Sequence, residues 1–224
     1  MTCRALLVGL ALVSAGAGPA WGEPASSPSP YVLARADPRL CPSPMCGGIW
    51  VKAVNAVSTG CGEGARQKEC YAASADLSGL QVDAKGRELL QRAIVEGRAV
   101  ARGRLVPGRV ADFPELDTLV VSGAWAASSS TARARGVFRR LRDNRIRCVR
   151  APCFWIAATV LNSSGSISIS SVDLSRVGAS PAERRRALEQ LGGPGLIAAG
   201  RIVRTADRGR AFVATQFYVR DGKG

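Results

Sequence analysis

Aspartates and cysteines are the side chains whose type and spacing could carry chemistry in this chain of 224 residues. The sequence has no histidine, which excludes serine–histidine and cysteine–histidine catalysis, histidine metal ligation and a histidine pH switch. Asp76 and Asp173 each precede Leu-Ser at the end of an expected strand. In one interpretation the two carboxylates face each other and share a proton, as in a hydrolase or transferase. In the other, which we favour, each aspartate begins a turn and binds backbone amides.

Motifs of the common enzyme classes are missing from the sequence. It contains no G-x-S-x-G, S-x-x-K, phosphate-loop or calcium-loop pattern, and these patterns place the nucleophiles and phosphate or metal ligands of large enzyme families. We therefore predict a protein that binds rather than catalyses, with no cofactor and no metal site.

The N-terminus has the pattern of a signal peptide. Met1–Gly22 begins with one positive charge, Arg4, continues with the apolar stretch Ala5–Val13 and ends in small residues, which is typical of a secretory leader. We expect cleavage before Glu23, with residues 23–29 forming a linker rich in serine and proline. The mature chain is then exported, periplasmic or secreted, without a transmembrane segment.

The mature sequence matches itself. Tyr31–Asn55 aligns with Phe138–Asn162 at an offset of 107 without a gap. The offset then falls to 97, at which Gly103–Val106 aligns with Gly200–Val203, so ten residues of the first copy are missing from the second. Self-similarity at a constant offset is the signature of a repeat, and we predict a tandem duplication.

Removal of the leader takes Cys3 away and leaves six cysteines, an even number in an exported chain, which indicates disulfides. Spacing alone does not settle the pairing. The segment missing from the second copy contains Cys61 and Cys70, the two cysteines without counterparts. Two cysteines gained in one insertion most simply form a disulfide with each other. Zinc is disfavoured because thiolates without histidine oxidise first in such a compartment. The favoured pairs are Cys41–Cys46, Cys61–Cys70 and Cys148–Cys153.

Both copies have the pattern strand-strand-strand-helix-strand-strand. Ile167-Ser168-Ile169-Ser170 alternates as a half-buried strand does. Asp83 can cap a helix over Ala84–Glu96, and Ser180 with Glu183 forms a capping box at the start of the second helix.

These elements predict an α+β fold made of two tandem-duplicated units. The first unit covers 30–129 and the second covers 130–224, and each is expected to be an antiparallel sheet with one packed helix, bridged by disulfides. Ala126–Ala132, with its three consecutive serines, is the expected linker. The sequence leaves open whether the two sheets fuse or stay separate.

Positive charge is concentrated in the second unit. Residues 30–129 contain twelve basic and ten acidic side chains, whereas 130–224 contain eighteen and six. Alternate side chains of a strand share one face, so an arginine-rich strand could attract anions in a salt-dependent way. A basic edge strand that prevents aggregation is an equally weighted alternative. The candidate anion-binding residues are Arg133, Arg135, Arg139, Arg140, Arg142, Arg145, Arg147 and Arg150.

The partner expected for this surface is an anionic envelope polymer or an acidic protein. Nucleic acid is disfavoured because no nucleic-acid-binding motif is present and Phe138 is the single aromatic residue in the cluster, whereas base-stacking surfaces need several.

Asp37–Gly48, followed by Val54-Asn55 and Glu69-Cys70-Tyr71, resembles an uncharacterised domain family of exported, mostly myxobacterial proteins. Arg147–Cys153 looks like the second cysteine loop of that family. The resemblance implies export and paired cysteines, and it implies no activity, catalytic residue or ligand. The first loop ends in a glycine pair that the second copy replaces by Phe154-Trp155.

Overall fold

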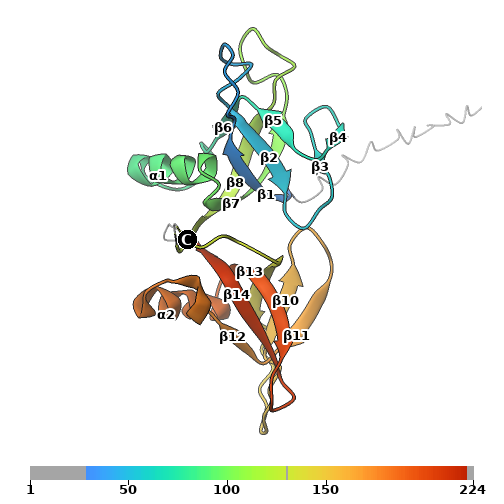
Figure 1. Ribbon diagram of the computed structural model, residues 1–224, viewed down its shortest axis with the longest axis vertical. Coiled ribbons are helices and arrows are strands. Elements are labelled where there is room, and N and C mark those ends of the chain that lie inside the picture. Colours follow the sequence, from blue (N-terminus) through green and yellow to red (C-terminus); the bar gives the residue numbers. More distant parts are fainter. Residues whose placement is uncertain (1–28, 130, 221–224) are drawn as a thin grey trace, which may run out of the picture.

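The computed structural model describes residues 29–129 and 131–220, so the predicted leader and the linker up to residue 28 lie outside the described part. The molecule is elongated, with the first half of the chain at one end and the second half at the other (Figure 1). Its main feature is a sheet of twelve strands in which the order is β11-β10-β9-β13-β14-β8-β7-β1-β2-β5. Strand β6 joins it in parallel beside β8, and β12 joins it beside β14.

The elements of the first half are β1 (Tyr31–Ala36), β2 (Ile49–Ala53), β3 (Thr59–Gly60), β4 (Arg66–Gln67), β5 (Cys70–Ala72), β6 (Ser74–Asp76), α1 (Ala84–Val95), β7 (Ala99–Val106) and β8 (Thr118–Ala127). Those of the second half are β9 (Val137–Asp143), β10 (Ile156–Val160), β11 (Ser166–Ile169), β12 (Ser171–Asp173), the short 3-10 turn Ser175–Val177, α2 (Pro181–Glu189), a second 3-10 turn Gln190–Gly192, β13 (Leu196–Arg204) and β14 (Arg210–Val219). Strands β3 and β4 form a separate two-stranded sheet.

The predicted α+β fold of two helix-packed units is wrong. The described residues form a mostly antiparallel β structure with two α-helices, and one sheet runs through both halves. The error lies in the predicted linker, because β8 extends to Ala127 and its end pairs with β14, with Ala126 opposite Val219 and Ala127 opposite Tyr218. This pairing satisfies backbone groups that would otherwise be left open at the edge of each half.

Three apolar clusters form the core. In the first half, α1 buries Leu90 and Ile94 against the sheet, and in the second half Ala187 of α2 and Leu191 do the same. A third cluster lies between the halves. There the strands of the first half and those of the second half, here called the two half-sheets, contact each other through the faces that the helices do not cover. The cluster consists of Val54, Val100, Trp125, Phe138, Leu161, Ile197, Ala199 and Tyr218. Each half-sheet is therefore buried on both faces near the join.

Strand pairing in the two halves follows one plan. Leu33 lies opposite Val100 between β1 and β7, and Arg140 lies opposite Ile197 between β9 and β13, which are the positions related by the offsets of 107 and 97. A register shift also occurs at the corresponding place in the β7–β8 and β13–β14 pairs. These equivalences support the predicted duplication, which stays a prediction.

Two asparagines connect the halves reciprocally. Asn162 donates from Nδ2 to the carbonyl oxygens of Tyr31, at 2.7 Å, and Val54, at 3.0 Å, and it accepts from the backbone N of Tyr31 at 2.7 Å. Asn55 makes the equivalent three bonds to backbone atoms of β9 and of the turn after β10. The two halves thus meet in a pseudo-symmetric contact, in which each turn supports the first strand of the other half.

Candidate functional site

Asp76 and Asp173 lie in local turns. Asp76 accepts a hydrogen bond from the backbone N of Ser78 at 2.9 Å, and Asp173 accepts one from the backbone N of Ser175 at 2.9 Å. Hydrogen bonds from these serines hold the pKa of both carboxyls below the usual range. Arg109 also pairs with Asp76 at 2.9 Å. Both carboxylates are thus ionised and engaged in turn structure.

The structure does not bring the two aspartates together. Asp76 lies opposite Val120 of β8, and Asp173 lies opposite Val213 of β14. Val120 is six residues before Ala126, and Val213 is six residues before Val219, the two residues at which β8 pairs with β14. Because β8 and β14 are antiparallel there, the two aspartates lie in opposite directions from the join. Twelve residues of strand at roughly 3.3 Å each place them about 40 Å apart along the sheet. A shared-proton site needs contact within a few ångströms, so this geometry removes the basis for the catalytic alternative.

The six cysteines of the described residues form three disulfides in the structure, with the same pairs that the repeat favours: Cys41–Cys46, Cys61–Cys70 and Cys148–Cys153. The loops closed by the first and third bridges lie at opposite ends of the long axis (Figure 1). The second bridge lies in the segment that is unique to the first half.

The loop at the first end is fixed by an arginine between two aromatic rings. The guanidinium of Arg39 lies 5.0 Å from the ring centroid of Trp50 and 4.9 Å from that of Tyr71. Asp37 accepts hydrogen bonds from Arg39 and from Nε1 of Trp50. These bonds lower the pKa of the Asp37 carboxyl to about 2, and the bond from Arg39 has the largest effect. The hydroxyl of Tyr71 donates to the carbonyl oxygen of Pro44 at 2.7 Å. This cluster neutralises the charge of Arg39. The spacing of Asp37 and Arg39 is visible in the sequence, but it does not by itself predict the contacts with Trp50 and Tyr71.

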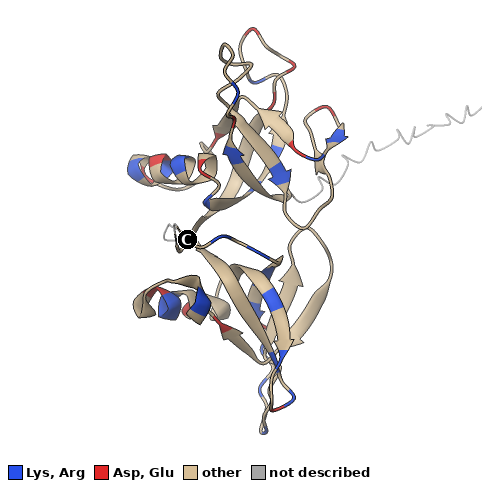
Figure 2. Ribbon diagram, viewed as in Figure 1, with Lys and Arg blue, Asp and Glu red and all other residues tan. Residues whose placement is uncertain are grey.

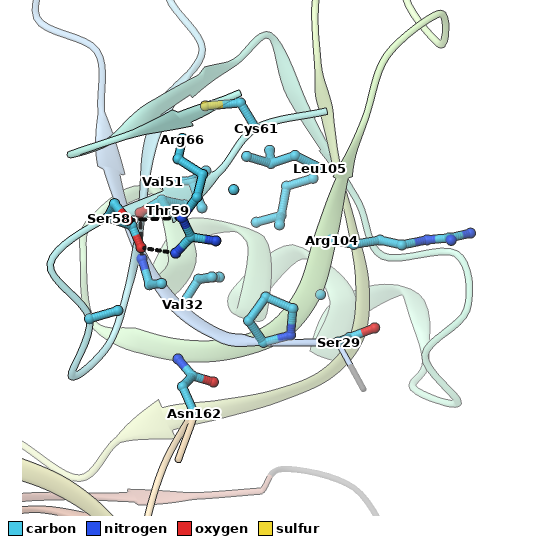
Figure 3. A pocket seen from close by; sticks show the side chains of 16 residues that line it. Ser29, Val32, Val51, Ser58, Thr59, Cys61, Arg66, Arg104, Leu105 and Asn162 are labelled. Carbon is cyan, nitrogen blue, oxygen red and sulfur yellow. Dashed lines mark hydrogen bonds between the residues drawn. The ribbon is translucent and has the colours of Figure 1, made fainter. Parts of the chain in front are cut away.

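A pocket of about 410 Å³ opens in the first half, between the sheet and the segment that carries Cys61 (Figure 3). Val32, Val51 and Leu105 contribute apolar surface to it. Arg66 also lines the pocket, and its guanidinium donates to the side-chain and backbone oxygens of Ser58 at 3.0 and 3.2 Å.

The chemistry of this pocket suits a small molecule with an apolar body and one negatively charged group. Among the described residues no acidic side chain lines it, and the Nη1 of Arg66 is not used by Ser58. One wall comes from the segment that includes the residues missing from the second copy. The insertion is visible in the sequence, but the pocket is not, because the insertion forms a wall only in the folded chain, where it lies near Val32 of β1 and Val51 of β2.

Two of the eight candidate arginines are used inside the fold. Arg139 is half-buried and donates to the carbonyl oxygen of Ala158 at 2.8 Å, and burial lowers its pKa. Arg140 lies over the ring of Tyr31, 5.6 Å from its centroid, and donates to the hydroxyl. Since β9 lies between β10 and β13, the interpretation as an edge strand is wrong. Neighbouring arginines on β9 also point to opposite faces, so the cluster is not one continuous surface.

The remaining six are exposed, namely Arg133, Arg135, Arg142, Arg145, Arg147 and Arg150. Arg142 lies near the end of β9, and Arg145, Arg147 and Arg150 lie in the segment that leads from β9 into the loop closed by Cys148–Cys153. The turn between β13 and β14 lies at the same end of the molecule (Figure 1), and Arg210 lies 5.3 Å from the ring centroid of Phe154, the residue directly after that loop. We call this surface the basic end and define it by Arg142, Arg145, Arg147, Arg150, Arg204, Arg208 and Arg210.

The acids within the basic end are already engaged. Asp143 pairs with Arg147 at 2.7 Å and accepts from the backbone N of Arg145, and these contacts lower its pKa. Asp207 accepts from Thr205 and from the backbone N of Gly209. Of the six ion pairs among the described residues, five lie in the first half and only Arg147–Asp143 lies in the second. The distribution of basic and acidic residues along the ribbon is shown in Figure 2.

Exposed aliphatic side chains accompany the arginines. Val149 is fully exposed, at 102 % of its reference area, and Ile146 is 49 % exposed. Both belong to the loop region around the third disulfide. A shallow hollow of about 390 Å³ lies beside Ile146, and it is also lined by the disulfide, Trp155 and the Asp143–Arg147 pair.

Within 29–129 and 131–220, no three cysteine, aspartate or glutamate side chains gather as metal ligands would. The helices described there are too short or too polar to span a bilayer.

These features define a disulfide-bridged, mostly antiparallel β protein with one basic end. The chain belongs to a family described as a domain of unknown function, DUF6748, whose model matches residues 30–222. Neither the curated proteins nor the solved structures contain a significant match.

Proposed function

We propose that this is an exported binding protein whose second half contacts an anionic envelope or extracellular partner through the basic end. The observation that carries the proposal is the surplus of exposed arginine there, seven side chains around two aspartates that are already engaged. Export is supported by the leader pattern and by the three disulfides, which persist in oxidising compartments.

The positive charge of the basic end attracts anions before they come into contact with it. Like charges that lie on one surface add their potentials, and they raise the local concentration of anions and the rate of encounter. Because the arginines are exposed, salt screens them, and binding weakens over the range in which the Debye length falls from about 30 Å to about 8 Å. The first half has nearly equal numbers of both charges and offers no comparable field.

The test is binding of the full mature chain to heparin, a soluble polyanion, with a triple substitution that leaves the fold intact. Arg142, Arg145 and Arg150 are exposed, and within the described ranges their side chains make no hydrogen bond or ion pair, so their replacement by serine is expected to remove charge without removing such contacts. We expect the triple variant to bind more weakly and with a smaller dependence on salt.

A matched variant removes the same charge from the first half. Lys85, Arg87 and Arg104 are also exposed, and their replacement by serine changes the net charge equally. We expect this control to retain most of the affinity for heparin. Equal weakening in both variants would mean that net charge alone governs binding, and it would overturn the proposal of a localised site.

A further inference from the structure

We propose that the anionic partner is a lipid bilayer with acidic headgroups, and that the basic end inserts Val149 and Ile146 among them. The inference rests on the proposed function and deepens it by naming the partner. In the bound state the arginines contact headgroup phosphates, while the two aliphatic side chains enter the boundary between headgroups and acyl chains.

The first observation is the combination of exposed apolar and basic side chains at one point. A single exposed valine is ordinary in a soluble protein, but Val149 lies directly before Arg150, in a loop that also presents Ile146, Arg145 and Arg147. Binding at a membrane interface depends on both buried apolar area and attraction to anionic lipids. A polyanionic polymer would use the arginines and leave the aliphatic side chains in water.

The second observation is that the loop is held before any partner binds. The Cys148–Cys153 bridge closes it, and Asn144 joins its two ends, donating from Nδ2 to the carbonyl oxygen of Phe154 at 2.9 Å and from its backbone N to that of Trp155 at 2.9 Å. Nε1 of Trp155 donates to the carbonyl oxygen of Ser170, which anchors the loop to the sheet. A rigid loop loses little conformational entropy on insertion.

The third observation is the position of the loop. It lies at the extreme end of the long axis beside the β13–β14 turn (Figures 1 and 2), which begins after Arg204 and carries Arg208. An extended flat surface can meet both segments at once. A phosphate-rich bilayer therefore matches the basic end in shape as well as in charge.

The opposite end provides an internal comparison. Leu40 is also fully exposed, at 102 %, and Met45 is 48 % exposed, so both ends present aliphatic side chains beside a disulfide. At the first end, however, Arg39 is neutralised by Asp37, and the neighbouring β7–β8 loop carries the exposed acids Asp112 and Glu115. Acidic side chains are repelled by an anionic bilayer, and we expect this end to stay in water.

The experiment is sedimentation of the mature protein with vesicles of phosphatidylglycerol and phosphatidylcholine, with pure phosphatidylcholine vesicles and heparin in parallel. We expect binding to the anionic vesicles alone among the two lipid preparations. Val149→Ser should weaken vesicle binding about tenfold or more, since a buried valine contributes at least that factor, and should leave heparin binding unchanged. Leu40→Ser, a matched change at the other end, should alter neither.

The outcomes separate the two proposals. Binding to heparin without binding to anionic vesicles would overturn the lipid inference and leave the proposed function standing. Binding to neither would overturn both. Vesicle binding that is unaffected by Val149→Ser, or reduced equally by Leu40→Ser, would show that the loop does not insert and would also overturn the inference.

Discussion

Replacing Asn162 by alanine should destabilise the protein by about 4 kcal/mol. Its side chain makes three hydrogen bonds to the backbone of Tyr31 and Val54 in the other half, between 2.7 and 3.0 Å, and each contributes about 1 kcal/mol net. Asn162 also has a φ of 60°, a left-handed conformation that costs most side chains about 1 kcal/mol more than asparagine or glycine. Urea unfolding with the disulfides intact measures the free energy.

Two further substitutions divide this cost into its parts. Asn162→Gly loses the same hydrogen bonds but accepts a positive φ, so it should be about 1 kcal/mol more stable than the alanine variant. Asn162→Asp keeps an acceptor for the backbone N of Tyr31, but it places a carboxylate against two carbonyl oxygens that need donors, and it should be at least as destabilising as glycine.

Asn55 supplies the matched test in the other half. It has a φ of 55° and makes three equivalent bonds, so Asn55→Ala should cost a similar amount. A loss below about 1 kcal/mol for either alanine variant would refute the view that these side chains hold the halves together. A double variant that costs clearly less than the two single losses together would indicate that one substitution already opens the contact.

Three other predictions concern pH and the disulfides. The pKa of Asp37 is about 2 in the folded protein and about 4 in the unfolded chain. Its carboxylate therefore stabilises the fold above pH 4, and this contribution is lost as the pH falls toward 2. In thermal unfolding, Asp37→Asn should be less stable than wild type at pH 7 and nearly equal to it near pH 2. Burial raises the pKa of Tyr218 above that of the unfolded chain, so stability should decline as pH rises above about 10, and Tyr218→Phe should reduce the slope of that decline in urea titrations. Removing the Cys61–Cys70 bridge by a double alanine substitution should cost about 3 kcal/mol, the closure entropy of a loop of this length. Urea unfolding of this variant, with its other two bridges intact, against the wild-type protein with all three bridges measures the loss.

Local signals in the sequence predicted the individual elements well. Helix α1 was expected over Ala84–Glu96 and covers Ala84–Val95, with the Asp83 side chain accepting from Gly86, and the capping box of Ser180 and Glu183 is present. Such signals act within a few residues, and a single sequence displays them directly.

The continuity of the sheet could not be predicted in the same way. It depends on a pairing of Ala126 with Val219, almost a hundred residues apart, and nothing in Ala126–Ala132 distinguishes the end of a strand from a small-residue linker. The alanines permit close packing against β14, but alanine is also compatible with a loop. Tertiary pairing therefore decided the fold class where local composition left it open.

The candidate site was predictable in composition but not in detail. The surplus of arginine was visible from the sequence, whereas the engagement of Arg139 by Ala158 and of Arg140 by Tyr31 depends on contacts between strands and between halves. The turn roles of Asp76 and Asp173 followed from the Asp-Leu-Ser pattern, since an aspartate that binds the amide two residues on is a local arrangement.

The two ends share a backbone arrangement and differ in side-chain chemistry. The backbone N of Asp37 donates to the carbonyl oxygen of Gly48, and at the equivalent position Asn144 donates to that of Trp155. Asp37 binds Arg39 at the first end, whereas the second end has neutral Asn144 and, where Arg39 would stand, the exposed Ile146. Since the same backbone contact forms with either set of side chains, the fold does not require an uncompensated arginine cluster at the second end. The charges and aliphatic side chains there are available for a partner, which is why we place binding at that end.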